Sequence, residues 1–306
     1  MRNNPLNVDL AGLHLDNPTM LASGILGFTA ETMHMIEKNG AGAVVAKSIG
    51  VKPRKGYANP TVVQVNGGLI NAMGLPNPGI DEYISEIQRA KKVLAVPLII
   101  SIYGYSAEEY AEVAEKAAYA GADAVELNVS CPHVKETGSE IGQNPKVLES
   151  VVRKVRAVTK VPVFVKVTPN VTDIAEIGEV AEKAGADALT ATNTVRAIAI
   201  NVETKMPILS NRGGGLSGSA AKPIALRCVY DLYERVEVPI VGCGGVTKWQ
   251  DAVEYLLAGA VAVQIGTAIA TEGPAIFREI SHGISGYLKR KGYKRVEDIV
   301  GLSHRS

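Results

Sequence analysis

Short apolar runs rich in β-branched residues recur along the chain, and amphipathic segments separate them. Eight of these runs have the length of a strand, and they read PTMLAS, AGAVVAKS, VPLIISIYG, AVELNVS, VPVFVKVTP, ALTATNT, VPIVGCGGV and AVAVQIGTA. Most are continuously apolar rather than alternating, which is typical of parallel strands covered on both faces. The segments between them carry charges at helical spacing, as SAEEYAEVAEKAAYAGADA does. The pattern therefore predicts eight βα units.

A phrase repeated at the ends of three predicted helices indicates one cyclic fold. AGADAVE, AGADALT and AGAVAVQ each place a glycine where a left-handed C-cap is needed, and a strand follows at once. Eight such units close most economically into a TIM (β/α)8 barrel, although a doubly wound sheet uses the same alternation. The chain has 306 residues, and such a barrel takes about 250. We expect an α/β protein with one barrel domain, residues 1–306.

Two segments are longer than ordinary connections, residues 49–78 after the second strand and residues 195–221 after the sixth. Both follow the C-terminal end of a strand, where the βα loops of a TIM barrel build the active site. Long loops in compact domains are usually functional. We therefore expect both insertions to border a ligand site. The segment NVDLAGLHLDNP is expected to form a small hairpin at the bottom of the barrel.

Charge and composition exclude several classes of protein. Lys and Arg number 32 against 31 Asp and Glu, and the net charge of +1 offers no field for nucleic acid or an anionic membrane. The three cysteines lack paired metal spacing and fit a reducing compartment. No signal-peptide pattern is present, and no apolar run reaches the roughly 18 residues of a membrane span. We expect a cytoplasmic protein without a metal site that binds a small molecule.

Polar residues and glycines gather at the C-terminal ends of the predicted strands. They are Ser23, Lys47, Ser48, Ser101, Asn128, Lys166, Asn193, Thr194, Gly244, Gly245, Gly266 and Thr267. Any one lysine or asparagine at such a position is more often a solvated rim or turn residue. Their shared position favours one cavity, with a polar ligand for groups that would otherwise be desolvated without partners. The glycines in GCGGV and QIGTA are typical of the phosphate site of these barrels, and RGGGLSGSA adds flexible backbone nearby.

The motifs, in their order, resemble those of the class 1 dihydroorotate dehydrogenases, most closely the class 1B catalytic subunits. They are LASG, AKS, NAMGLPNPG, ELNVSCP, VKVTPN, TNT, GGGLSG, GCGG and IGTA, and they span nearly the whole chain. The resemblance implies an FMN-binding barrel that oxidises dihydroorotate to orotate in pyrimidine biosynthesis.

The resemblance also implies roles for individual residues. The cofactor-binding residues would be Ser23, Lys47, Ser48, Ser101, Asn128, Lys166, Thr192, Gly218, Gly244, Gly245, Gly266 and Thr267. The substrate-binding residues would be Lys47, Asn71, Ala72, Met73, Gly74, Leu75, Asn128, Asn193 and Thr194. Lys166 would stabilise the negative charge of the reduced flavin ring, and Lys47 would take the substrate carboxylate with the amides of NAMGL.

By the same resemblance, Cys131 in NVSCPHVK would be the general base. Oxidation removes a hydride from one ring carbon and a proton from the next, so a base must face the flavin across the substrate. A cysteine thiol has an ordinary pKa of about 8.5, and we therefore expect a rate that rises with pH into the alkaline range. Cys228 and Cys243 fall in a predicted helix and at a strand end, and we expect them to be packing residues.

Two positions depart from the family pattern. His133 stands where SCPN would offer another substrate amide, and Ser101 stands where an asparagine is usual. SCPH, GQNP, TPNVTDI, TATNTV and KPIALR also resemble the pyrimidine-reducing barrel of dihydropyrimidine dehydrogenases, which bind uracil. Against that second interpretation, Lys47 and NAMGLPNPG read as a carboxylate clamp, and the cysteine-rich iron–sulfur regions of those enzymes are missing from the sequence. A third interpretation is a phosphate-binding aldolase or isomerase that uses Lys47 or Lys166 as a Schiff base.

The sequence carries no second dinucleotide-binding unit, so electrons must leave to something external. The resemblance to class 1B implies a partner subunit with FAD and a [2Fe–2S] cluster that passes electrons to NAD, in a homodimer or heterotetramer. Fumarate, the class 1A acceptor, is the alternative. The insertion at 195–221 is the segment where we expect self-association.

Overall fold

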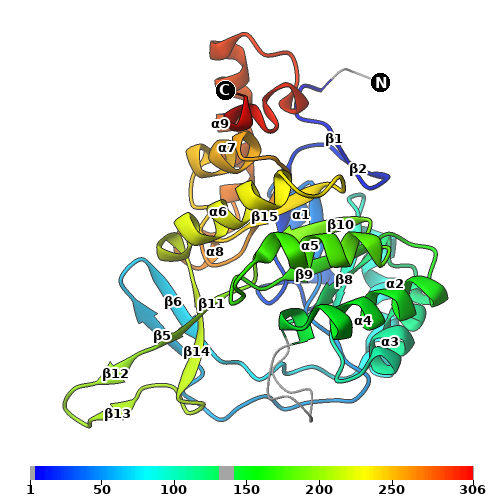
Figure 1. Cartoon of the computed structure of the whole chain (residues 1–306), viewed down its shortest axis with the longest axis vertical. Coiled ribbons are helices and arrows are strands. Elements are labelled where there is room, and N and C mark those ends of the chain that lie inside the picture. Colours follow the sequence, from blue (N-terminus) through cyan, green and yellow to red (C-terminus); the bar gives the residue numbers. More distant parts are fainter. Residues whose placement is uncertain (1–3, 131–140, 306) are drawn as a thin grey trace.

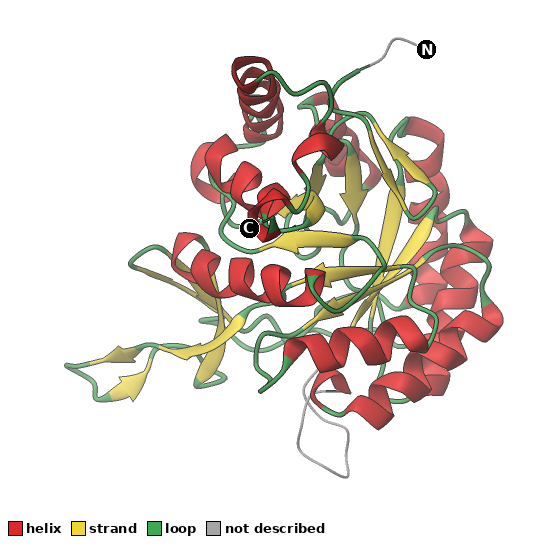
Figure 2. Cartoon of the chain, turned by 45° about the horizontal axis from the view of Figure 1, so that its top comes forward, coloured by secondary structure: helices red, strands yellow, loops and turns green. Residues whose placement is uncertain are grey.

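The computed structural model describes residues 4–130 and 141–305. Its centre is a barrel of eight parallel strands (Figures 1 and 2). The barrel is closed because β16 pairs with β3. In barrel order the strands are β3 (Thr19–Leu21), β4 (Ala43–Val45), β7 (Leu98–Ile102), β8 (Ala124–Asn128), β9 (Val163–Val167), β10 (Ala188–Ala191), β15 (Ile240–Cys243) and β16 (Ala260–Ile265). Each lies in one of the eight predicted runs. The predicted TIM barrel is confirmed, and the doubly wound alternative is excluded because the sheet closes on itself.

Helices follow the strands and cover the outside of the barrel (Figure 2). They are α1 (Ala30–Lys38), α2 (Ile80–Val93), α3 (Ala107–Ala120), α4 (Pro145–Val158), α5 (Ile174–Lys183), α6 (Lys222–Tyr233), α7 (Trp249–Leu257), α8 (Ile269–Glu272) and α9 (Ile276–Lys291). Short 3-10 turns are η1 (Ile141–Gln143), η2 (Ser219–Ala221), η3 (Val296–Ile299) and η4 (Leu302–His304).

Local sequence signals explain where several helices begin and end. The side chains of Ser106, Asn144 and Asp173 accept hydrogen bonds from backbone N–H groups in the first turns of α3, α4 and α5. The glycines of the repeated phrase, Gly121, Gly185 and Gly259, have φ angles of 108°, 106° and 113°. A glycine adopts this left-handed region without steric cost, so each helix ends there and the chain turns directly into the next strand.

The predicted N-terminal hairpin is present as the antiparallel pair β1 (Val8–Leu10) and β2 (Leu13–Leu15). Leu10 and Leu15 are fully buried in the hydrophobic core, and β1 contacts β16. Because the chain passes from the hairpin almost directly into the start of β3, the hairpin lies at the N-terminal end of the barrel strands.

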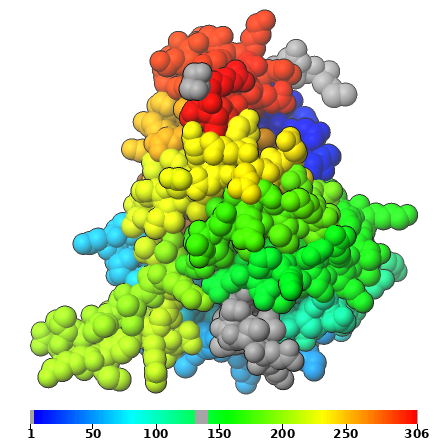
Figure 3. All heavy atoms as spheres, in the orientation of Figure 1, coloured from blue at the N-terminus to red at the C-terminus, as the bar shows by residue number. Residues whose placement is uncertain are grey.

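The two insertions, which the sequence predicted only as long loops, join into one antiparallel sheet. The first provides β5 (Val62–Val65) and β6 (Gly68–Asn71), and the second provides β11 (Val195–Ile198) and β14 (Gly213–Ser217), in the order β11-β14-β6-β5. Beyond this insertion sheet, β12 (Ile200–Asn201) and β13 (Met206–Pro207) form an arm, residues 198–207, that projects from the body of the molecule (Figures 1 and 3). No helix among the described residues is both long enough and apolar enough to cross a membrane.

Candidate active site

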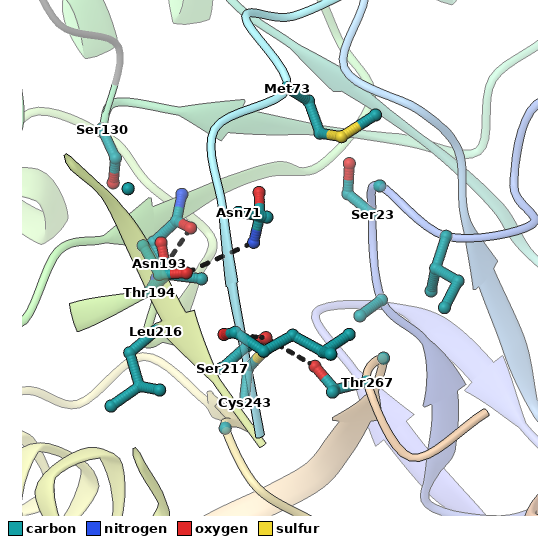
Figure 4. Close-up of a pocket in the computed structure, with 18 of the residues that line it drawn as sticks. Ser23, Asn71, Met73, Ser130, Asn193, Thr194, Leu216, Ser217, Cys243 and Thr267 are labelled. Atoms are coloured by element: carbon teal, nitrogen blue, oxygen red, sulfur yellow. Dashed lines mark hydrogen bonds between the residues drawn. The ribbon is translucent and has the colours of Figure 1, made fainter. Parts of the chain in front are cut away.

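A cavity of about 900 Å³ lies between the C-terminal ends of the barrel strands and the insertion sheet. All residues that the sequence assigned to cofactor or substrate binding line it, from Ser23 after β3 to Thr267 after β16. Figure 4 shows part of this lining. Cys131, the predicted base, lies outside the described residues, as does His133, which differs from the family pattern. Ser130, directly before Cys131, lines the cavity.

A chain of hydrogen-bonded polar side chains crosses one wall of the cavity. The Ser48 Oγ lies 2.8 Å from the Ser101 Oγ and 3.3 Å from the Ser23 Oγ. The Asn128 Nδ2 donates to the Ser48 Oγ at 3.2 Å, and the Asn193 Nδ2 donates to the Asn128 Oδ1 at 3.0 Å. These residues lie at or near the C-terminal ends of five different barrel strands, so closure of the barrel brings them together. Their mutual bonds fix which donors and acceptors remain for a ligand.

Lys166 on β9 is a buried cation at the cavity, with an exposed fraction of 6%. Its Nζ donates to the Gln264 Oε1 at 2.7 Å and lies 3.8 Å from the Glu126 Oε1. Burial alone would lower the pKa of Lys166, but the neighbouring Cys243 and Glu126 outweigh it, and the pKa of Lys166 is raised. Lys166 therefore remains an ammonium at neutral pH.

Lys47, which follows β4, is a second cation on the cavity wall. Among the described residues, its Nζ has no hydrogen-bond or ion-pair partner. Its burial lowers the pKa of Lys47. A desolvated ammonium without an opposite charge favours the binding of an anion, because the anion would supply the missing interaction.

Glycine turns at the ends of β14 and β15 form another part of the wall. Gly218, Gly244 and Gly245 have φ angles of 101°, 139° and 68°. A Cβ on Gly245 would come within 2.6 Å of the Gly218 carbonyl oxygen, so the two turns pack this closely only with a glycine at position 245. Close by, the Thr267 Oγ1 donates to the Ser217 Oγ at 2.7 Å (Figure 4). The turns expose backbone without side chains, as a phosphate site requires.

The segment Asn71–Leu75 lines the side of the cavity formed by the insertions. Asn71 ends β6 and lies opposite Gly215 on β14. The Arg54 Nε donates to the Gly74 carbonyl at 3.0 Å and fixes the following turn. Asn71 thus faces the cavity from a paired strand, whereas residues 72–75 follow that strand as an irregular segment.

Several residues at or beneath the cavity were missed by the sequence reasoning, which considered the ends of strands and the residues that the family resemblance implies. Gln264 lies inside β16, and Glu126 lies inside β8 beneath the lining residue Asn128. A polar or charged residue within an otherwise apolar strand, as in AVELN and AVQIG, was the available signal. Arg54, Asn170 and Arg196 also line the cavity. Asn170 ends the motif VKVTPN, whereas the sequence surroundings of Arg54 and Arg196 carry no comparable signal.

The two described cysteines differ in position. Cys228 is buried in α6, as predicted for a packing residue, and burial raises the pKa of its thiol to about 11. Cys243 at the end of β15 is partly buried and lines the cavity beside Lys166 (Figure 4). Burial also raises the pKa of the Cys243 thiol. Cys243 is therefore an uncharged part of the wall at neutral pH.

The chain forms a closed (β/α)8 barrel with a polar cavity at the C-terminal ends of its strands, which is the architecture of a barrel enzyme. Two desolvated lysines and several glycine turns on the cavity wall suit an anionic ligand. The model of the dihydroorotate dehydrogenase family matches residues 5–288. The chain belongs to the dihydroorotate dehydrogenase family. This result confirms the resemblance carried by the motifs and the prediction of an oxidoreductase.

Individual relatives agree with this assignment. The catalytic subunit of dihydroorotate dehydrogenase B (NAD(+)) from Pyrococcus abyssi is 54% identical over 97% of this chain and 99% of its own length. The corresponding subunit from Methanosarcina acetivorans is 51% identical over 97% of this chain and 95% of its own. The crystal structure of DHODH from Eimeria tenella in complex with ferulenol has a TM-score of 0.86 and 25% identity, over 100% of this chain and 90% of that chain.

Proposed function

We propose that this chain oxidises dihydroorotate to orotate with FMN as its redox cofactor, in pyrimidine biosynthesis. One observation carries the proposal. Every described residue that the family resemblance assigns to the cofactor or the substrate lines the same cavity. These residues come from the barrel strands and from both insertions, and they belong to a chain of the family named for this reaction.

The residues present fit FMN. The backbone around Gly244, Gly245, Gly266 and Thr267 would hold its phosphate, with Gly218 adjacent, because no side chains obstruct these turns. Ser23, Ser48, Ser101, Asn128 and Thr192 would bond the edges of its ring. FMN would supply the hydride acceptor. The Lys166 ammonium would then offset negative charge at the ring from a fixed position.

The remaining groups suit a cyclic amide that carries a carboxylate. Lys47 would pair with the carboxylate, and the backbone of residues 72–75 would add N–H donors. Asn71, Asn128, Asn193 and Thr194 would bond the amide edges of the ring. The unpaired charge of Lys47 favours dihydroorotate over uracil, which has no carboxylate to offer. Cys131, which follows the cavity residue Ser130, is proposed as the base that removes the proton.

We also propose a partner subunit that carries FAD and a [2Fe–2S] cluster and passes electrons to NAD. The relatives at 54% and 51% identity are named as catalytic subunits of NAD(+) enzymes, which supports this arrangement. The arm of residues 198–207 would mediate association into a homodimer or heterotetramer. Apolar side chains on it are exposed to solvent, namely Ile198, Ile200, Val202 and Met206.

The first test is an anaerobic absorption spectrum of the purified protein before and after addition of dihydroorotate, and separately of dihydrouracil. We expect a flavin band that dihydroorotate bleaches and dihydrouracil does not. A flavin band that responds only to dihydrouracil would transfer the enzyme to the dihydropyrimidine class. A protein without affinity for FMN would overturn the redox proposal and restore the Schiff-base alternative.

A further inference from the structure

Beneath the cavity, a buried carboxylate is connected to Lys166 through an amide side chain. Glu126 on β8 is fully buried, and its Oε2 accepts hydrogen bonds from the Gln264 Nε2 at 2.5 Å and the Thr190 Oγ1 at 2.9 Å. Its Oε1 has no hydrogen-bond partner among the described residues and lies 3.8 Å from the Lys166 Nζ. The charges of Glu126 and Lys166 are thus close, but no direct hydrogen bond joins them.

Gln264 provides the missing connection, and its orientation is determined from both sides. The Gln264 Oε1 accepts from the Lys166 Nζ at 2.7 Å, while its Nε2 donates to Glu126. Reversal of the amide would place the NH2 group against the ammonium and the carbonyl oxygen against the carboxylate. Both contacts would then be repulsive in a buried site. The carboxylate of Glu126 therefore fixes Gln264, and Gln264 in turn fixes the Lys166 Nζ.

Cys243 also raises the pKa of Lys166, but none of the other groups that face Lys166 carries a negative charge at neutral pH. Cys243 from β15 is the remaining titratable neighbour, and burial keeps its thiol protonated at neutral pH. Thr190 from β10 is neutral, and Lys47 after β4 is a cation of the same cavity. Within the described part of the chain, Glu126 is thus the counter-charge of Lys166. The hydrogen bond to Gln264 uses one of the three N–H groups of Lys166, so the ammonium retains donors for a ligand.

We infer that Glu126 is a positioning residue for the reaction: through Gln264 it holds the Lys166 ammonium at the cavity and keeps it charged. The consequence for a bound flavin rests on the proposed function, because it requires FMN in the cavity. The charge state of Lys166 does not depend on the proposed function, because Glu126, Gln264 and Lys166 all belong to this chain.

The test is a pH titration of the lysine side-chain signals in FMN-free protein labelled with [13Cε]lysine, in which Lys166→Met identifies the Lys166 signal. In the wild-type protein, Lys166 should titrate above the ordinary value of about 10.4. In Glu126→Gln, which keeps the shape of the side chain, its pKa should fall by about one to three units, the effect of losing a close opposite charge. Gln264→Leu should also lower it. Thr190→Val, which removes one bond to Glu126 but retains its charge, should titrate as the wild type does.

Two outcomes would overturn the inference. One is a wild-type Lys166 that titrates below 10.4, a result that requires neither Glu126→Gln nor Gln264→Leu to fold. The other is a Cys243→Ala protein that lowers the pKa of Lys166 while Glu126→Gln leaves it unchanged, because Cys243 would then be the counter-charge.

A second measurement extends the test to the FMN-loaded protein. In Glu126→Gln, the reduction potential of the bound flavin should fall more steeply with rising pH in the range where Lys166 loses its proton. In Lys166→Met, this steeper fall should be absent. A protein that does not bind FMN would refute the proposed function, while the lysine titration would still decide the role of Glu126.

Discussion

Asn71 and Gly215 lie opposite each other on the neighbouring antiparallel strands β6 and β14, although they are 144 positions apart in the sequence. The Asn71 Nδ2 donates to the Gly215 carbonyl at 3.4 Å. On Gly215, a Cβ would come within 2.0 Å of the Thr194 Oγ1. This glycine therefore allows two proposed substrate-binding residues, Asn71 from the first insertion and Thr194 from the segment after β10, to approach the same part of the cavity.

Gly215→Ala should raise the KM for dihydroorotate and lower the midpoint of thermal unfolding. The added methyl group must displace Thr194 or open the insertion sheet, and overpacking of this kind costs about 1–3 kcal/mol. Gly213→Ala on the same strand is the matched control, because its Cβ would meet only the Ala197 carbonyl oxygen at 3.5 Å. Steady-state kinetics and thermal unfolding of both variants give the comparison. Equal behaviour of the two would contradict the steric argument.

Lys47→Met should separate substrate binding from stability. Loss of an ionic hydrogen bond to the substrate carboxylate should raise the KM for dihydroorotate about 10- to 100-fold. The midpoint of thermal unfolding should stay the same or rise, because the variant removes a desolvated ammonium that has no partner among the described residues. Lys92→Met, at an exposed position of α2, should change neither quantity. An unchanged KM for Lys47→Met would refute the carboxylate clamp.

The affinity for orotate should depend on pH in a direction set by Lys47. Burial lowers the pKa of Lys47 in the ligand-free protein, whereas a bound carboxylate would raise it again. Orotate therefore binds best while Lys47 is charged, and its affinity should fall as pH rises through the lowered pKa. Isothermal titration from pH 7 upward measures this change, with proton uptake on binding at alkaline pH. The affinity of Lys47→Met should lack this dependence.

Cys131→Ser should retain FMN but lose most flavin reduction by dihydroorotate near neutral pH. A serine hydroxyl has a far higher pKa than a thiol, so almost none of it is deprotonated near neutral pH and available as a base. In the wild type, the rate should increase with pH toward the ordinary thiol pKa of about 8.5. Anaerobic stopped-flow reduction across pH tests both points. Cys228→Ala is the control, since Cys228 is buried in α6, and reduction kinetics of Cys131→Ser equal to those of this control would remove Cys131 from the mechanism.

Asp251→Asn should destabilise the turn that follows β15. The Asp251 Oδ2 accepts from the backbone N–H and hydroxyl of Thr247, and its Oδ1 accepts from the Lys222 Nζ at 2.8 Å. The free energy of unfolding at pH 7 should fall by about 1–3 kcal/mol, and FMN affinity should fall with it. Asp231→Asn, which breaks a more exposed pair with Arg227, should cost about 0.5 kcal/mol or less.

The pH dependence of this effect has a defined sign. Burial alone would raise the pKa of Asp251, but the hydrogen bonds from Lys222 and Thr247 outweigh it, and the pKa of Asp251 is lowered. Its stabilisation is thus complete above the unfolded value of about 3.9 and is lost as pH falls through the lower folded value. Denaturant unfolding at several pH values measures the free energy of unfolding of both proteins. The difference between wild type and Asp251→Asn should disappear only below a pH of about 4. If this difference in free energy disappeared already near neutral pH, the stabilising role of the Asp251 carboxylate would be contradicted.

The sequence alone determined the barrel and most of its cavity. Continuous apolar runs identify strands covered on both faces, and glycine C-caps such as Gly121 mark where each unit ends. Once eight parallel strands close, their C-terminal ends must converge, so the positions of Ser48, Asn128 and Lys166 at one cavity followed from strand order.

Only the tertiary structure decided how these residues are connected. The pairing of Asn71 with Gly215 joins two insertions, and the contact of Glu126 with Gln264 joins β8 to β16 across the barrel interior. Such contacts depend on register and on side-chain direction after closure, which no local pattern of apolar and polar residues encodes. Glu126 reads in the sequence as one charge within a strand. In the folded chain it becomes the counter-charge of Lys166, because the barrel buries both groups 3.8 Å apart and desolvation makes their separation costly.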